Sequence, residues 1–112
     1  MSESLLSWSR ELLGALGPVR SRRMFGGHGL YVDEVFVALI AGGTLYLKVD
    51  DTTRGRFVDA GCQPFVYAKA GGQQGVMSYF NAPEEAMESP EQMLPWARLA
   101  MWSALRAKAA KA

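Results

Sequence analysis

Residues 30–49, LYVDEVFVALIAGGTLYLKV, are the stretch of this 112-residue sequence that decides the fold. Three short apolar segments are separated by two-residue connections, Asp33-Glu34 and Gly42-Gly43. The last segment alternates apolar and polar residues, which is typical of a strand with one buried face. Two tight turns that join three short strands predict an antiparallel meander.

A helix is expected before this meander. Ser2 or Ser4 can cap its start, and Gly17-Pro18 stops it, because glycine suits a left-handed cap and proline cannot continue a helix. From Arg22 onward the pattern becomes extended. Apolar side chains recur at helical spacing on one face of the helix: Leu5, Trp8, Leu12, Leu13 and Leu16.

A short helix and two further strands are expected after the meander. Residues 50–53, DDTT, offer several helix caps, and the helix should bury Phe57 and Val58 and end at Gly61. Residues 64–70 and 76–80 are the two strands, joined by a glycine-rich turn.

The last helix has a strong start signal. Ser89 is a cap, Pro90 fits the first helical position, and Gln92 lies three residues after the cap. We expect the helix to reach about Lys108, with a kink or a restart near Pro95, where a backbone donor is missing.

The expected order is therefore α-β-β-β-α-β-β-α. A mostly antiparallel sheet with helices packed on one face is an α+β fold. The chain is predicted to be a single domain, 1–112, with an ordered core at about 4–108.

Composition limits the possible functions. Apolar residues make up 49% and charged residues 21%, as in a folded globular protein, and the net charge of +1 gives no global signal for nucleic acid. No apolar run approaches a membrane span, and the first residues do not resemble a secretory signal, so we expect a cytoplasmic protein without membrane contact.

No catalytic motif, cofactor site or metal site is predicted. His28 and the only cysteine, Cys62, lie on separate elements. The glycines at 26, 27 and 29 lead into a strand and lack the spacing and the lysine of a phosphate loop, so a structural role is favoured. The acidic pairs Asp50-Asp51 and Glu84-Glu85 suit helix starts. We therefore expect a protein that is not an enzyme.

One basic segment is the best candidate contact surface. Arg20, Arg22 and Arg23 precede the glycine run, with Phe25 directly after them. They could meet an acidic protein surface or nucleic acid phosphates. The alternative is a solvated strand edge that charge protects against aggregation.

The last helix is apolar nearly all round, which predicts burial on two sides or a partner. One face should pack on the sheet, and it consists of Leu94, Ala97, Met101, Ala104 and Leu105. The candidate oligomer interface on the other side is Trp96, Leu99 and Trp102, and a homodimer is the expected assembly.

Several motifs occur in a fixed order along about residues 10–107. They are RRMFGGHGLY at 22–31, LYLKVD at 45–50, Gly61 with PFVY at 64–67, MSYF at 77–80, Pro83 and LPWA at 94–97. This ordered set resembles the N-terminal domain family of the TfoX/Sxy competence regulators. The resemblance implies a helix-sheet fold like that of secretion-chaperone-like domains. It also implies a co-regulator of DNA uptake genes that acts with the cAMP receptor protein.

Three functions remain open at this point. The first is a non-enzymatic regulatory module that contacts a transcription factor or a polymerase subunit. The second is a direct nucleic-acid binder that uses the arginine cluster and the C-terminal Arg98, Arg106, Lys108 and Lys111. The third is a small-molecule binder or hydrolase with a site near the glycine run, which a deep pocket lined by His28 would favour.

Overall fold

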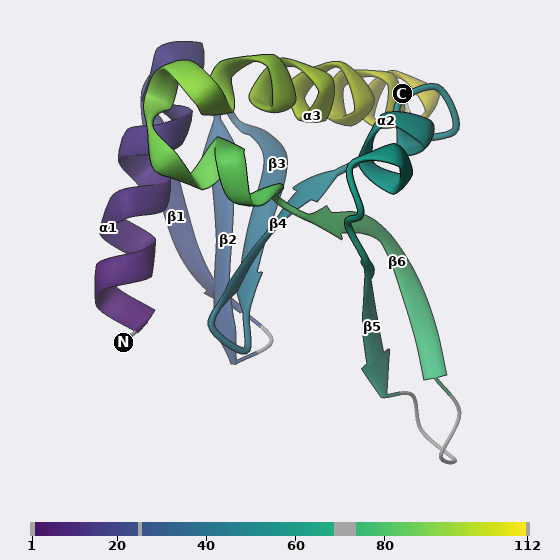
Figure 1. The fold of residues 1–112 in the computed structure, drawn as a ribbon, viewed down its shortest axis with the longest axis horizontal. Helices are drawn as coiled ribbons and strands as arrows, with labels where there is room; N and C mark the ends of the chain where they lie inside the picture. The colour runs from purple at the N-terminus through teal and green to yellow at the C-terminus, as the bar shows by residue number, and fades with distance from the viewer. Residues whose placement is uncertain (1, 25, 69–73, 112) are drawn as a thin grey trace.

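The computed structural model describes residues 2–24, 26–68 and 74–111 as an open antiparallel sheet with helices (Figure 1). Along the chain the elements are α1 (Ser2–Leu13), the 3-10 turn η1 (Gly14–Leu16), β1 (Val19–Met24), β2 (Gly27–Val32), β3 (Val35–Ala41), β4 (Thr44–Lys48), α2 (Arg54–Asp59), β5 (Pro64–Ala68), β6 (Gln74–Asn81), the 3-10 turn η3 (Glu84–Glu88) and α3 (Pro90–Lys111).

The expected α+β class is confirmed, but the sheet has six strands, in the order β1-β2-β3-β4-β6-β5, and not five. The additional strand is β1, which pairs antiparallel with β2 in a register that places Arg22 opposite Gly29. Its sequence, VRSRRM, lacks the apolar alternation of a half-buried strand, because both of its faces are largely open. Sequence reasoning therefore identified extended backbone there without recognising a paired strand.

A β-bulge explains why β3 is apolar along almost its whole length. Leu30 pairs with Ala38, but Tyr31 pairs with Phe36, so Val37 is an extra residue in β3. Val37 and Ala38 are both fully buried and both belong to the core cluster. A bulge lets two neighbouring residues, here Val37 and Ala38, point to the same face. The alternation along β3 is reversed at this point, so Phe36 lies on the opposite face of the sheet.

The helices cover one face of the sheet. Leu12 of α1, Phe57 of α2 and Ala97 of α3 all belong to one buried cluster. The strands contribute alternate residues to the same cluster, such as Leu45 and Leu47 of β4, as the period of two requires. Figure 1 shows α3 lying across the strands and the β5–β6 hairpin extending away from the helices.

α3 runs without a break through Pro95, and the expected restart does not occur. Its start is the predicted one, since Ser89 Oγ accepts a hydrogen bond from the Gln92 backbone N–H at 3.1 Å. Pro95 and Glu91 are both on the exposed side of the helix. Water can therefore satisfy the Glu91 carbonyl that lost its donor, which is why the helix tolerates the proline.

Only one of the two apolar residues expected to be buried in α2 is buried. Phe57 is fully buried, with its ring centroid 5.0 Å from that of Trp96 and 6.1 Å from that of Phe80. Val58 is 55% exposed, so the prediction of its burial was wrong. The helix has six residues and presents one narrow stripe to the core, which leaves the adjacent position in solvent.

Candidate functional site

The arginines of β1 are divided between the two faces of the sheet. Arg20 pairs with Tyr31 and Arg22 with Gly29, whereas Arg23 pairs with His28. Directly paired residues of an antiparallel ladder point to the same face. Arg20 and Arg22 therefore lie on the face without helices, which we call the open face, and Arg23 lies on the other. Phe25 lies outside the described residues.

Arg20 is bound within the domain. Its guanidinium donates to both carboxylate oxygens of Glu34, at 2.9 and 3.2 Å, and lies 4.8 Å from the Tyr31 ring centroid. Arg22 and Arg23 are exposed, and within the described ranges neither makes an ion pair. The predicted arginine cluster thus leaves two guanidinium groups available to a partner.

The glycine run has a structural role. A Cβ on Gly27 would overlap the carbonyl oxygen of Ile40, and one on Gly29 would lie 2.7 Å from the Met24 methyl carbon. Gly26 has φ +72°, a conformation that favours glycine. His28 sits between strands β1 and β3, and its Nδ1 is buried without a hydrogen-bond partner among the described residues.

The open face carries a continuous row of aromatic rings with a cation at each end. The Tyr31 and Phe36 rings stack with centroids 5.0 Å apart, and Phe36 meets Tyr79 at 5.7 Å. Arg20 lies over Tyr31, and the Lys48 Nζ lies 5.0 Å from the Tyr79 centroid. Burial raises the pKa of Tyr79 above its usual value, so its phenol is neutral at physiological pH. The row forms a second, smaller apolar layer on the face opposite the main core.

The three residues expected at an oligomer interface differ in how far they are buried within the domain. Leu99 is 5% exposed and belongs to the core cluster, and Trp96 packs edge-on against Phe57. Trp102 is 51% exposed. Leu105, one turn further along the helix, is 45% exposed, so its expected packing on the sheet was wrong. Packing within the domain therefore accounts for Trp96 and Leu99, and the outward apolar surface consists of Trp102 and Leu105.

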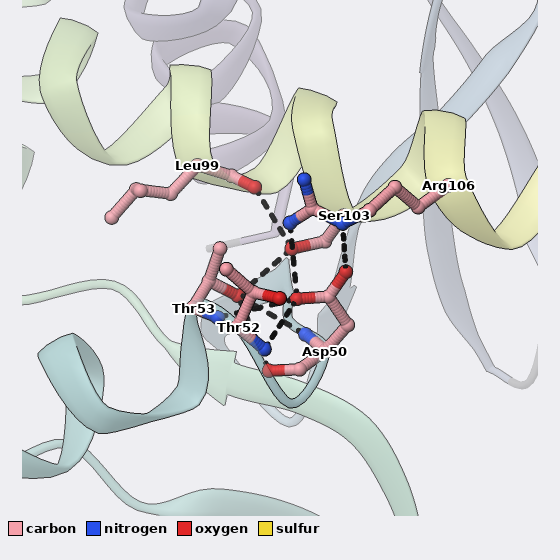
Figure 2. Close-up of polar contacts among 6 residues, drawn as sticks. All are labelled: Asp50, Thr52, Thr53, Leu99, Ser103 and Arg106. Carbon is pink, nitrogen blue, oxygen red and sulfur yellow. Dashed lines mark hydrogen bonds and ion pairs between the residues drawn. The ribbon is translucent and has the colours of Figure 1, made fainter.

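A polar cluster fastens the start of α2 to the middle of α3 (Figure 2). The backbone N–H of Asp50 donates to Thr53 Oγ1 at 3.0 Å, and Thr53 Oγ1 lies 2.8 Å from Ser103 Oγ. Ser103 donates its single hydroxyl proton to the Leu99 carbonyl at 2.9 Å, so Thr53 must be the donor in the hydroxyl pair. The result is a directed chain of three hydrogen bonds, buried at its centre.

The buried hydroxyl pair predicts a coupled loss of stability. Thr53→Val and Ser103→Ala should each lower the free energy of unfolding by about 1–3 kcal/mol, because each leaves a buried polar group unpaired. The double variant should lose about 1 kcal/mol less than the sum. Urea denaturation measures the stability of the two single variants and the double variant. Thr52→Ala is the control, because Thr52 is an exposed neighbour of Thr53. Strictly additive losses would contradict a direct hydrogen bond.

Asp50 also forms an ion pair with α3. Arg106 Nε donates to Asp50 Oδ2 at 2.6 Å and its terminal nitrogen to Oδ1 at 3.1 Å. The hydrogen bond from Arg106 lowers the pKa of Asp50 from 3.8 to about 2, with help from the Thr53 and Thr52 backbone N–H groups and against the opposing effect of burial. This carboxylate therefore fixes a loop in place.

The lowered pKa of Asp50 predicts that part of the free energy of unfolding is lost in acid. The folded pKa lies below the unfolded value, so the stabilisation is complete above about pH 4 and is lost as the pH falls toward 2. We expect wild type to lose about 1–2 kcal/mol more than Asp50→Asn over this window, allowing for solvent screening of a partly exposed pair. Denaturant midpoints at pH 5, 4, 3 and about 2 measure the difference. Parallel curves for the two proteins would show that Asp50 is not responsible.

The other candidate chemical groups are not arranged for catalysis. Cys62 follows α2 and is 6% exposed, and burial raises the pKa of its thiol, which disfavours the reactive thiolate. Asp51 pairs with Arg54, and Glu84 and Glu85 are exposed in η3. Within the described part of the chain, no three His, Cys, Asp or Glu side chains gather as metal ligands. None of the described helices is long and apolar enough to cross a membrane.

Two surface hollows stand out among the described residues, and His28 lines neither. One, of about 780 Å³, is largely open to solvent between α1 and β1, where Arg10 donates to the Val19 carbonyl. The other, of about 320 Å³, lies between α3 and the open face. Neither of these two hollows lies at the glycine run, where the third possible function would place its site.

A sequence model of the TfoX N-terminal domain matches residues 11–104. The chain belongs to the TfoX N-terminal domain family. This match confirms the resemblance that the motifs indicated. The antiparallel sheet and three helices described above are the fold of this TfoX N-terminal domain.

Two curated relatives are similar to this TfoX N-terminal domain. DNA transformation protein TfoX1 of Aliivibrio fischeri (strain ATCC 700601 / ES114) is 30% identical over 86 residues, which are 77% of this chain and 41% of the relative. Protein Sxy of Escherichia coli (strain K12) is 24% identical over 103 residues, which are 92% of this chain and 49% of the relative. The chain thus spans less than half the length of each relative.

Sequence reasoning missed the aromatic row on the open face. Tyr31 and Phe36 flank the Asp33-Glu34 turn. Strict alternation followed from that turn along β3 and into β4 would place both rings on the face opposite Tyr79. The bulge at Val37 reverses the alternation and brings them to the face of Tyr79. One signal was available: Lys48 and Tyr46 occupy the polar positions of the alternating β4 strand. That alternation identified a face directed away from the helices, but not the rings that cover it.

Proposed function

We propose that this TfoX N-terminal domain is a non-enzymatic regulatory module of DNA transformation that acts in the cytoplasm through protein contacts. The observation that carries the proposal is the edge strand β1, which presents Arg22 and Arg23 exposed and without ion pairs among the described residues. The name of the relative TfoX1, a DNA transformation protein, supports the link to that process.

The chemistry of this edge suits an acidic protein surface. Guanidinium groups bind carboxylates in a planar, two-point geometry, and an edge strand also offers unpaired backbone donors and acceptors. The expected partner is a transcription factor or a polymerase subunit that presents Asp or Glu side chains on an extended segment.

The same structure weakens the alternative of direct nucleic-acid binding. Two members of the basic clusters are neutralised inside the domain, because Arg20 binds Glu34 and Arg106 binds Asp50. Affinity for a duplex depends on how many phosphates the basic residues neutralise. The net charge of +1 also gives the chain no overall attraction to phosphates.

Affinity capture from the native cell, followed by mass spectrometry, tests the proposal. Wild type should recover a transcription factor or polymerase subunit, and Arg22→Glu/Arg23→Glu should recover at least about tenfold less. The matched control is Arg56→Glu/Arg98→Glu, which makes the same charge change at two exposed positions on α2 and α3. Equal recovery by both double variants would reject β1 as the contact.

A gel-shift series separates the nucleic-acid alternative. Wild type should not retard a short duplex even at about 50 mM salt. Retardation that disappears in Arg22→Glu/Arg23→Glu and weakens steeply with salt would replace the protein-contact proposal with direct binding.

A homodimer remains part of the proposal, with the contact centred on Trp102. Trp102 and Leu105 lie on the outward side of α3, and an exposed aromatic residue suits the centre of an interface. Sedimentation velocity of wild type should give a dimer, and Trp102→Glu a monomer with an unchanged circular dichroism spectrum. A wild-type monomer at every concentration would exclude this assembly.

A further inference from the structure

One side of the β1 backbone has no partner strand. β1 is the first strand in the order β1-β2-β3-β4-β6-β5, so it pairs with β2 alone. Among the described residues, the only hydrogen bond to its backbone from outside that ladder comes from Arg10, which donates to the Val19 carbonyl at 3.4 Å. Over the six residues Val19–Met24, the strand therefore offers a row of N–H and C=O groups to a further strand.

A hollow of about 780 Å³ lies beside this edge, where α1 approaches the start of β1. Figure 1 shows the two elements next to each other at one end of the sheet. Val19 pairs with Val32 of the core, so its side chain lies on the same face as α1. Leu6 and Val19 line the hollow, and a Cβ on Gly14, another lining residue, would meet no atom within 4 Å. The hollow can therefore receive an apolar side chain from a strand added beside Val19.

The exposed arginines lie further along the same strand. Arg23 is on the helix face with Val19, and Arg22 is on the open face. An added strand would place one side chain beside each guanidinium, and a carboxylate there would gain two-point hydrogen bonds. The same charges disfavour a second copy of β1 as the added strand, because antiparallel pairing would bring the arginines of both copies together.

We infer that β1 binds an acidic segment of a partner protein by antiparallel strand addition, with one apolar side chain of that segment in the hollow beside α1. The inference rests on the proposed protein contact at Arg22 and Arg23 and specifies its geometry. Two neighbouring acidic residues of the segment lie beside Arg23 and Arg22. The apolar residue follows three positions after the second of them, beside Val19, because neighbours in a strand alternate between faces.

Titration of the ¹⁵N-labelled protein with synthetic peptides tests the inference. The peptide TEETTLT, with both ends blocked, has the acidic pair and the apolar residue at the required spacing. It should shift the amides of residues 14 and 19–24 with a Kd on the order of 0.1 mM. TEETTST, without the apolar residue, should bind about tenfold more weakly, and TQQTTLT, without the charges, at least about threefold more weakly. Tighter binding of the reversed peptide TLTTEET would overturn the antiparallel direction.

Backbone methylation of the peptide separates strand addition from side-chain contacts alone. Successive residues of a strand direct their N–H groups to opposite sides, so only alternate N–H groups of the peptide face β1. One variant of TEETTLT carries N-methyl groups at its third and fifth residues, and another at its fourth and sixth. One of the two should bind about tenfold more weakly than TEETTLT, and the other within about threefold. Equal effects would overturn strand addition.

Two protein variants locate the contacts. Gly14→Leu fills the hollow and should remove the preference for TEETTLT over TEETTST. The matched control is Ala15→Leu, at an exposed neighbour that does not line the hollow, and it should keep that preference. Arg22→Gln/Arg23→Gln should remove the preference for TEETTLT over TQQTTLT. Thermal midpoints near that of wild type establish that the variants are folded. Preferences that survive in these variants would overturn the assigned contacts.

Failure of this inference and failure of the proposed function give different results. If only strand addition is wrong, the peptide does not bind or both methylated forms bind alike, while capture from the cell still depends on Arg22 and Arg23. If the proposed function is wrong, Arg22→Glu/Arg23→Glu and its control recover the same proteins from the cell, even where one methylated form alone loses binding.

Discussion

Replacing Gly27 by alanine is expected to lower the free energy of unfolding by about 3 kcal/mol, the upper end for overpacking. A Cβ there would overlap the carbonyl oxygen of Ile40 and lie 2.9 Å from its carbonyl carbon. Both are backbone atoms of β3, so no side-chain rotation can relieve the contact. The start of β2 would have to move away from the end of β3, which costs ladder hydrogen bonds.

Gly55→Ala is the matched control for this substitution. A Cβ on Gly55 meets no atom within 4 Å, and the residue lies in α2. Alanine is the better helix former, so this variant should gain about 0.5–1 kcal/mol. Urea denaturation of both variants, with unchanged slopes, gives the comparison. A Gly27→Ala protein as stable as wild type would show that the close approach of β2 to β3 is not required.

Phe57→Ala is expected to cost about 3–5 kcal/mol, as for other large aromatic residues removed from a core. The side chain is fully buried, and its ring meets Trp96 at 5.0 Å and Phe80 at 6.1 Å. It is the residue through which α2 joins α3 to β6. Without it, the short helix loses its main apolar contact with the rest of the domain.

Val58→Ala provides the control, since it removes an apolar side chain from the next position in the same helix. Val58 is largely exposed, so the change should stay within about 0.5 kcal/mol. Phe57→Leu should lie between the two. Thermal or urea unfolding measures the series, and equal losses at 57 and 58 would show that α2 is not anchored by Phe57.

The fold was largely predictable because its signals are local. Each of these signals involves residues no more than four positions apart. They are the turns at Asp33-Glu34 and Gly42-Gly43 and the helix cap at Ser89. The β1 strand was missed, since an edge strand with three arginines shows no buried face. The bulge at Val37 depends on the pairing of two strands, which no single segment of sequence reveals.

The candidate site was less predictable for a similar reason. The sequence grouped Arg20, Arg22 and Arg23 by proximity along the chain, whereas the ladder separates Arg23 from the other two and Glu34 neutralises Arg20. Helical periodicity placed Trp96 and Leu99 away from the sheet, but it could not reveal that α2 packs there, because that packing joins residues far apart in sequence.

The hydrogen bond between Thr53 and Ser103 joins positions 50 residues apart, and this separation bears on how the domain folds. A ribosome makes the strands and α2 well before α3 appears. Until α3 has emerged, the hydroxyl of Thr53 lacks its partner Ser103 and the apolar face of β2–β4 lacks the side chains of α3 that cover it. Completion of this domain therefore waits for α3, and contacts of such long range slow the search for the native state. A nascent chain that stalls before Ser103 would expose that apolar face and would need a chaperone.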